Sequence, residues 1–146
     1  MTATGDLVDQ VTFDVERGKI REFARATFAA DPIYTDEQAA AERRFPDVVA
    51  TPTYAVVTAH HRNQREWVLG LGLDIARVVM GSSHWEYRRP FVAGDRITAT
   101  RRVLTDERKQ ASRGALRILT LETEYTDDEG SVVLVQRDVV IERPNS

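Results

Sequence analysis

TYAVVTAHH, residues 53–61, is apolar on nearly every side when it is drawn as an α-helix. Its apolar positions are Tyr54, Ala55, Val56, Val57 and Ala59. A helix without a polar side is found in protein interiors, because most of its surface avoids water. Thr51 is a suitable capping residue and Pro52 suits a first helical position. The sequence therefore predicts a long buried helix at the centre of the molecule.

The chain after Gly72 alternates between apolar and polar residues, which is typical of strands. We expect strands at about residues 75–80, 83–89, 96–106, 114–126 and 132–142. On the last of them, Val133, Val135, Val139 and Ile141 share a face. A buried helix followed by antiparallel strands predicts an α+β fold, with about five or six strands wrapped around the helix. The exposed edges of such a sheet commonly pair with a second copy or a relative.

The residues before the central helix predict a short overhanging helical segment. Helical spacing relates Ile20, Phe23, Ala24, Thr27 and Phe28. Pro32 should end this helix close to Ala30, and a short second helix is expected over residues 35–44, capped by Thr35 or Asp36. We expect a flexible arm at residues 1–11, one domain over 12–143 and a tail at 144–146.

Composition excludes several classes of function. A net charge of −3 and a pI near 5.6 argue against nucleic acid as a partner. No apolar run reaches the roughly 18 residues that a membrane span needs. The first ten residues, MTATGDLVDQ, lack the features of a secretory signal, so we expect a cytoplasmic protein. The chain has no cysteine, which excludes disulfides and thiolate chemistry.

Several short motifs, in this order and spacing, resemble those of the MaoC-like dehydratases, which have the hotdog fold. The motifs are Lys19–Ala24, Asp31-Pro32, Pro46–Ala50, Gly72–Asp74 with Arg77–Val79, and Tyr87–Asp95. The resemblance covers residues 13–141 and is closest to the non-catalytic, substrate-binding subunits of mycobacterial (3R)-hydroxyacyl-carrier-protein dehydratase. It implies a single hotdog domain that binds an acyl-CoA or acyl-carrier-protein thioester without a cofactor.

The first loop departs from the catalytic pattern of this family, Asp-x-Asn-Pro-[Ile/Leu]-His. Alignment on Pro32 places Ala29 at the aspartate, Asp31 at the asparagine and Tyr34 at the histidine. Hydration of an enoyl thioester needs one group to activate water and another to exchange the α-carbon proton. Alanine does neither, and a tyrosine with a pKa near 10 is a poor base at neutral pH. We therefore expect no catalytic residue at the standard positions.

The resemblance also implies where a substrate would bind. Thr51, Thr53 and Tyr54 begin the central helix, where backbone N–H groups polarise the thioester carbonyl in the family. Pro52 lacks an N–H and stands where catalytic members tend to have histidine, which puts that role in doubt. An apolar slot for the acyl chain would be lined by Ile33, Tyr54, Val57 and Trp85.

Three residues have open interpretations. Asp31 is either a displaced general base or a turn and cap residue beside Pro32. Tyr34 either donates into the pocket or packs as an ordinary aromatic side chain. His84 is either an unorthodox acid or base or a structural histidine of its strand. His60 and His61 are adjacent and point about 100° apart on a helix, so we expect no metal site there.

The leading hypothesis is a dehydratase or hydratase subunit that binds the acyl chain in a hotdog dimer, with itself or with a catalytic MaoC-like chain. A second hypothesis is a homodimeric hydratase or acyl-CoA thioesterase that uses Asp31, Tyr34 or His84. A third is a non-catalytic module that only binds an acyl thioester. The fold alone does not choose among them, because sites rather than folds carry function.

Overall fold

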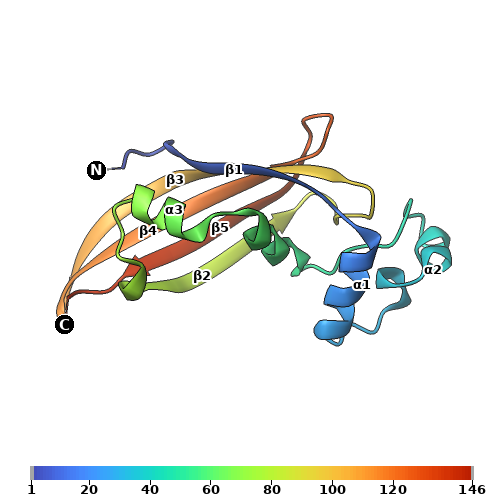
Figure 1. Cartoon of the computed structure of the whole chain (residues 1–146), viewed down its shortest axis with the longest axis horizontal. Coiled ribbons are helices and arrows are strands. Elements are labelled where there is room, and N and C mark those ends of the chain that lie inside the picture. The colour runs from blue at the N-terminus through green and yellow to red at the C-terminus, as the bar shows by residue number, and fades with distance from the viewer. Residues whose placement is uncertain (1, 146) are drawn as a thin grey trace.

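The structure is a computed structural model that describes residues 2–145. Its five strands form one antiparallel sheet in the order β1-β3-β4-β5-β2 (Figure 1). The strands are β1 (Leu7–Asp14), β2 (Val78–Tyr87), β3 (Arg96–Ala111), β4 (Gly114–Thr126) and β5 (Val132–Glu142). The long central strands are strongly curved, and both edges of the sheet, β1 and β2, lack a partner strand within the described residues.

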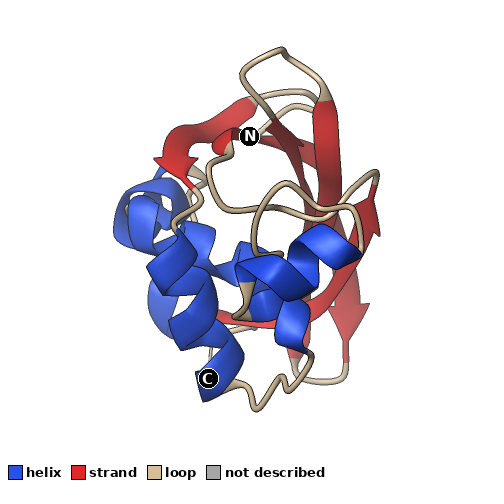
Figure 2. Cartoon of the chain, turned by 90° about the vertical axis from the view of Figure 1, so that its right-hand side faces the viewer, coloured by secondary structure: helices blue, strands red, loops and turns tan. Residues whose placement is uncertain are grey.

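The helical segments gather on one side of the sheet (Figure 2). The α-helices are α1 (Arg17–Ala26), α2 (Glu37–Glu42) and α3 (Gln64–Gly70), and the 3₁₀ segments are η1 (Pro32–Tyr34), η2 (Tyr54–His61) and η3 (Ile75–Arg77). α1 and α2 project beyond one end of the sheet, whereas η2 and α3 lie across it (Figure 1). This confirms the α+β class and the overhanging helical segment. No helix of the described chain is long and apolar enough to cross a membrane.

The central helix is shorter and less enclosed than the sequence predicts. η2 is a 3₁₀ segment of eight residues, in which Tyr54, Ala55 and Thr58 are buried. Residues three apart share a side of a 3₁₀ helix, which places Ala55 and Thr58 together toward the sheet. Val56 lies on another side and is 47% exposed. The prediction of burial on every side was wrong for this residue.

Two strands predicted separately, at 75–80 and 83–89, are one strand in the structure. β2 pairs with β5 along its length, and the register shifts between Met80 and Ser82. A Cβ atom at Gly81 would lie 2.9 Å from the Cδ1 atom of Ile141. Gly81 therefore marks a bulge where two strands approach closely, rather than the end of a strand. Residues 75–77 form η3 instead of a strand.

Residues 7–11 of the flexible arm expected at residues 1–11 belong to a strand. β1 begins at Leu7, and Gln10 and Val11 lie opposite Thr100 and Ala99 of β3. The side chain of Gln10 donates to the hydroxyl of Thr100 at 2.8 Å. The sequence misled us because a register shift between Leu7 and Asp9 interrupts the alternation of apolar and polar residues at the start of this strand. Residues 1 and 146, the outer ends of the predicted arm and tail, lie outside the described residues.

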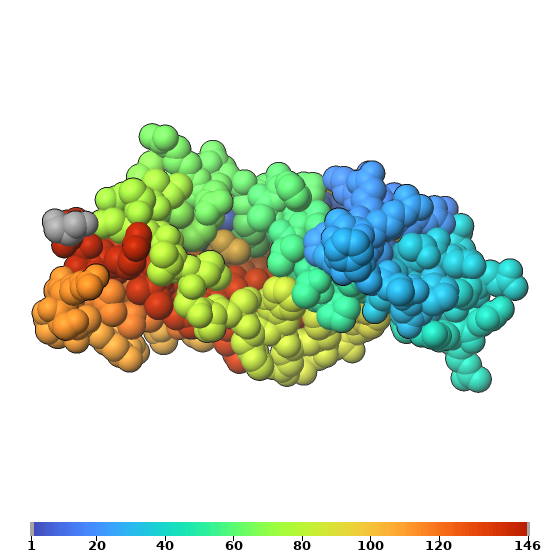
Figure 3. Space-filling view, turned by 90° about the horizontal axis from the view of Figure 1, so that it is seen from below, coloured from blue at the N-terminus to red at the C-terminus, as the bar shows by residue number. Residues whose placement is uncertain are grey.

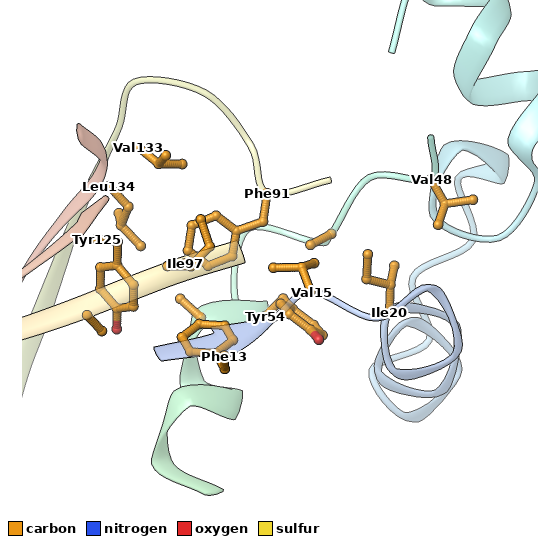
Figure 4. Close-up of a cluster of buried hydrophobic side chains, with 13 residues drawn as sticks. Phe13, Val15, Ile20, Val48, Tyr54, Phe91, Ile97, Tyr125, Val133 and Leu134 are labelled. Atoms are coloured by element: carbon orange, nitrogen blue, oxygen red, sulfur yellow. The ribbon is translucent and has the colours of Figure 1, made fainter. Parts of the chain in front are cut away.

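The main core joins α1, η2 and one end of the sheet (Figure 4). Tyr54 of η2 packs edge-on against Phe23 of α1, with ring centroids 5.6 Å apart. Phe91 lies 5.7 Å from Tyr125 by the same measure and connects the loop before β3 to β4. A second cluster lies beneath α3 and contains Val68, Leu71, Leu73, Val103, Leu119, Leu121 and Val140. The two clusters hold η2 and α3 separately against the sheet.

β5 turns two of its polar residues inward, while Arg137 between them is exposed. Gln136 and Asp138 are buried, whereas Val135, Val139 and Ile141 are only partly buried on the other face. Val135, Val139 and Ile141 do share a face, as predicted, but it is the face that turns away from η2. Val133, predicted on the same face, is instead fully buried in the main core. Period-two patterning identifies the two faces of a strand without indicating which one is covered.

α1 ends in a conformation that favours glycine but uses phenylalanine. The N–H of Phe28 donates to the carbonyl of Arg25 at 3.2 Å, and that of Ala29 to Ala24 at 2.8 Å, which is a Schellman motif. Phe28 has φ = 57° and its side chain is 92% exposed. A left-handed backbone costs a residue with a Cβ atom about 1 kcal/mol.

We predict that Phe28→Gly raises the free energy of unfolding by about 1 kcal/mol, because glycine relieves this strain. Chemical denaturation of the isolated chain measures the change. Phe28→Ala is the matched control: it removes the exposed ring and keeps the strained backbone, so its stability should stay near that of the wild type. A Phe28→Gly variant less stable than the wild type would contradict the expectation.

A nearly buried ion pair joins β3 to β4. The guanidinium of Arg117 donates to the carboxylate of Asp106 at 2.7 and 3.0 Å and to the carbonyl of Leu71 at 2.8 Å. The hydrogen bonds from Arg117 hold the pKa of Asp106 below its ordinary value. A lowered pKa in the folded state stabilises the protein at pH values above the unfolded pKa, and this stabilisation is lost as pH falls through the folded pKa.

We predict that Asp106→Asn lowers the free energy of unfolding at neutral pH by about 2 kcal/mol. The difference from the wild type should shrink below about pH 4, where the carboxylate of the unfolded chain takes up its proton, and vanish below the lower pKa of the folded state. Urea titrations at several pH values measure both effects. Asp14→Asn is the control, because the Asp14–Arg96 pair is exposed and should contribute less than about 1 kcal/mol.

Candidate functional site

The first loop, residues 29–34, is held by backbone hydrogen bonds and has neither the aspartate nor the histidine of the family pattern. Ala29 follows the Schellman turn of α1 and is half-buried, and Tyr34 closes η1, also half-buried. The carbonyl of Ile33 accepts the N–H of Val49 at 2.9 Å, which ties the loop to the segment before η2. The backbone geometry around Pro32 therefore holds without a reactive side chain at position 29 or 34.

Asp31 is engaged on both carboxylate oxygens. One oxygen caps η1 by accepting the N–H of Ile33 at 3.1 Å, and the other accepts the guanidinium of Arg43 at 2.8 Å. The hydrogen bond from Arg43, followed by that from Ile33, lowers the pKa of Asp31 below its ordinary value. These contacts are those of a capping residue, and they make the carboxylate a weaker base.

The start of η2 has fewer free hydrogen-bond donors for a ligand than the sequence predicts. The N–H of Tyr54 donates to the carbonyl of Thr51 at 3.0 Å, so this donor is occupied. Thr53 is exposed and its side chain makes no capping hydrogen bond. The hydroxyl of Tyr87 donates to the carbonyl of Pro52 at 2.5 Å, which fixes this turn to the end of β2.

The four residues of the expected acyl slot do not line a single cavity. Tyr54 is buried in the main core, and burial raises the pKa of its hydroxyl to about 12. Val57 lines a shallow depression beside α1 together with Phe23. Ile33 belongs to η1 in the overhanging segment. Of the four residues, only Trp85 lines the apolar hollow beneath η2.

His84 and Trp85 are neighbours on β2 and point to opposite faces of the sheet. Trp85 is partly buried and packs against the main core, whereas His84 is exposed opposite Arg137 of β5. The structure thus separates His84 from the cavities and keeps Trp85 beside one. No three His, Asp or Glu side chains among residues 2–145 converge as metal ligands.

A cavity of about 420 Å³ lies between η2, α3, β2 and the inner face of the sheet. We call it the inner cavity. In the space-filling view from below, atoms of the sheet are visible between the green segment of η2 and α3 and the yellow-green β2 (Figure 3). Apolar atoms dominate its wall, from residues that include Ala55, Val56, Met80, Trp85, Leu121 and Val140. Small-molecule pockets typically measure about 300 to 1,000 Å³.

Polar side chains form a connected network on the floor of the inner cavity. The carboxylate of Asp138 accepts the hydroxyl of Ser83 at 2.5 Å and the amide of Gln136 at 2.9 and 3.0 Å. The carbonyl oxygen of Gln136 accepts the hydroxyl of Tyr125 at 2.7 Å. The guanidinium of Arg101 lies 3.9 Å from Asp138. Buried polar groups need such partners, because each unpaired group costs free energy.

Two arginines carry positive charge into the inner cavity. Burial, followed by repulsion from Arg101, lowers the pKa of Arg62 to about 10, so both side chains stay charged at neutral pH. Sequence reasoning missed Arg62, Arg101, Gln136 and Asp138. The available signal for Gln136 and Asp138 was their alternation on β5 with the apolar residues of the opposite face; Arg62, between η2 and α3, gave no such signal. The arrangement suits binding of a small molecule.

Comparison with known proteins agrees with this architecture. The family model of the FAS1-like dehydratase domain region matches residues 2–136. A UPF0336 protein of Saccharopolyspora erythraea is 37% identical over 134 residues, which span 90% of this chain and 82% of the relative. A UPF0336 protein of Clavibacter michiganensis is 38% identical over 130 residues, spanning 88% and 85% of the two chains.

Solved structures show the same fold. The HadBC (3R)-hydroxyacyl-ACP dehydratase complex of Mycobacterium tuberculosis has a chain that superimposes with a TM-score of 0.79 at 23% identity, covering 97% of this chain and 98% of its own. A MaoC-like dehydratase from Rhodospirillum rubrum gives 0.72 at 26% identity, covering 98% and 95%. The hotdog fold expected from the sequence is confirmed, and the chain belongs to the family of FAS1-like, MaoC-like dehydratase domains.

Proposed function

We propose that this chain is the acyl-binding subunit of a (3R)-hydroxyacyl-thioester dehydratase or enoyl-thioester hydratase. The first loop carries the proposal: its sequence aligns with the dehydratase motif on Pro32, whereas Ala29 and Tyr34 stand where that motif has aspartate and histidine. A related partner would then supply the acid and base. The substrate would be the thioester of CoA or of an acyl-carrier protein.

The free edge of β2 supports assembly with a second hotdog chain. Within the described residues this edge pairs with no strand, and Met80 on it is 59% exposed. Val56 of η2 is also exposed, and both residues line the inner cavity. A partner on this side would cover apolar surface and enclose the cavity, which favours a homodimer or heterodimer.

The alternative is a homodimeric hydratase or thioesterase with non-standard catalytic residues. Asp31 is held by Arg43 with a lowered pKa, and His84 points away from the inner cavity. Both observations count against a reactive role in this chain. Both observations are compatible with a module that only binds an acyl thioester. Such a module would show no turnover with any partner, whereas the proposed subunit would.

We predict that the purified chain alone does not hydrate an enoyl-CoA, and that it gains activity with a MaoC-like partner that carries Asp-x-Asn-Pro-[Ile/Leu]-His. The loss of enoyl-thioester absorbance follows the reaction, and copurification tests the assembly. Replacing the aspartate of the partner should abolish turnover, because the partner supplies the chemistry. Robust hydration by the isolated chain would overturn the proposal.

In the active assembly, Trp85→Ala should raise KM about tenfold with little change in kcat, because it removes binding surface that is used equally in the ground and transition states. His84→Ala is the matched control on the neighbouring residue, whose side chain lies on the opposite face. It should leave both constants unchanged. A loss of kcat in His84→Ala would favour the alternative enzyme with non-standard residues.

A further inference from the structure

Unsatisfied polar atoms concentrate at the inner cavity. Among the described residues, five buried side-chain atoms lack a hydrogen-bond partner: Thr51 Oγ1, Thr58 Oγ1, Arg62 Nε, Arg62 Nη2 and Trp85 Nε1. Four of the five belong to Thr58, Arg62 and Trp85, which all line this cavity. Buried donors are rarely left without an acceptor, since each one costs about 1 to 3 kcal/mol. Their concentration at one place indicates a ligand that supplies the acceptors.

Arg62 presents one complete edge of its guanidinium without a partner. Its side chain is only 3% exposed, and its Nη1 atom contacts the carboxylate of Asp9. The Nε–H and the adjacent Nη2–H form the edge that binds a carboxylate through two parallel hydrogen bonds. Neither atom of this edge makes a hydrogen bond of ordinary geometry, although the hydroxyl of Tyr125 lies close enough to Arg62 to favour its charged form.

Two acceptors that line the cavity already receive hydrogen bonds. Asp138 accepts from Ser83 and Gln136, and the carbonyl oxygen of Gln136 accepts from Tyr125. The guanidinium of Arg101 lies over the ring of Trp67, 5.2 Å from its centroid, and its charge is balanced by that of Asp138, 3.9 Å away. The cavity thus has a surplus of donors and a predominantly apolar wall. This combination matches a ligand with a carboxylate at the end of an apolar chain.

We propose that the inner cavity binds the carboxylate at the far end of a short aliphatic acyl group, through the Nε–Nη2 edge of Arg62. This inference rests on the proposed function and narrows its substrate class from plain fatty acyl thioesters to those with a terminal carboxylate. Trp85 Nε1 supplies a further donor, and the apolar wall holds the methylene chain. A plain alkyl end would displace water from the cavity without accepting hydrogen bonds from these donors. Their burial without partners costs free energy, which disfavours binding of a plain alkyl chain.

Tryptophan fluorescence reports on this site directly, because the two tryptophans of the chain, Trp67 and Trp85, both line the inner cavity. Titration of the full chain with hexanoate and with hexan-1-ol compares an anionic with a neutral end on the same chain. Titration with adipoyl-CoA and hexanoyl-CoA makes the same comparison on a thioester. In each pair we expect the carboxylate-bearing probe to bind with a Kd about tenfold lower.

Arg62→Lys tests the geometry while it keeps the positive charge beside Asp9. Lysine lacks the fork, so the preference for the anionic probe should fall from about tenfold to about twofold or less. Arg65→Lys is the matched control, because Arg65 is exposed on α3 outside the inner cavity. Trp85→Phe removes one donor and keeps an aromatic ring, with Trp67 as the remaining reporter. It should weaken the anionic probe alone, and it tests the site independently if Arg62→Lys does not fold.

Equal affinities for the anionic and neutral probes, unchanged in Arg62→Lys and Trp85→Phe, would overturn the inference and indicate that water alone fills the cavity. The proposed function would then stand with a plain acyl chain as substrate. Absence of acyl-CoA binding and of turnover with any partner would overturn the proposed function instead. The comparison of hexanoate with hexan-1-ol still decides whether the cavity is an anion site in that case.

Discussion

A break between two short helical segments determines the interior of this protein. η2 ends at His61 and α3 begins at Gln64, because Asn63 caps α3 by accepting the N–H of Glu66 at 3.2 Å. Arg62 occupies the break in an extended conformation, with φ = −102° and ψ = 145°. One continuous helix would carry its apolar surface along the whole sheet. The break instead separates the two apolar clusters and brings a charged side chain between them.

The polar floor of the inner cavity follows from this constraint. Tyr125, Gln136 and Asp138 lie on inner positions of β4 and β5, where neither apolar cluster alone fills the space. Their hydrogen bonds to one another reduce the cost of burial, and Arg101 balances the charge of Asp138. Each partner depends on the others, so the network specifies one arrangement of β2 against β5 as well as a binding surface.

The sequence predicted features that depend on local chemistry. Asp36 caps α2 as expected, accepting the N–H of Gln38 at 2.8 Å, and Pro32 begins a separate turn. The alternation of apolar and polar residues in the sequence also predicted β4 and β5. Which face of β5 is covered was not predictable, because apolar Val139 and polar Asp138 offer opposite signals that only the curvature of the sheet resolves. Arg62 was missed for a related reason, since a charged residue after a histidine pair resembles an ordinary helix end.

The backbone conformation of the first loop does not depend on the side chains that would carry out catalysis. The turn after α1 rests on backbone hydrogen bonds, and the turn at Pro32 rests on the Asp31 cap. Neither depends on the side chain at position 29 or 34, so both sites tolerate residues that cannot transfer protons. Family resemblance therefore identifies the fold through this loop more securely than it identifies an activity.

The bulge at Gly81 limits which strands can pair with the outer edge of β2. It divides the outer edge of β2 into one stretch before Gly81 and another after it, and it adds twist between them. A flat strand from an unrelated protein can follow only one stretch, whereas a chain with a matching irregularity can follow both. The same glycine thus makes the edge selective in its choice of neighbour and protects it from indiscriminate addition of strands.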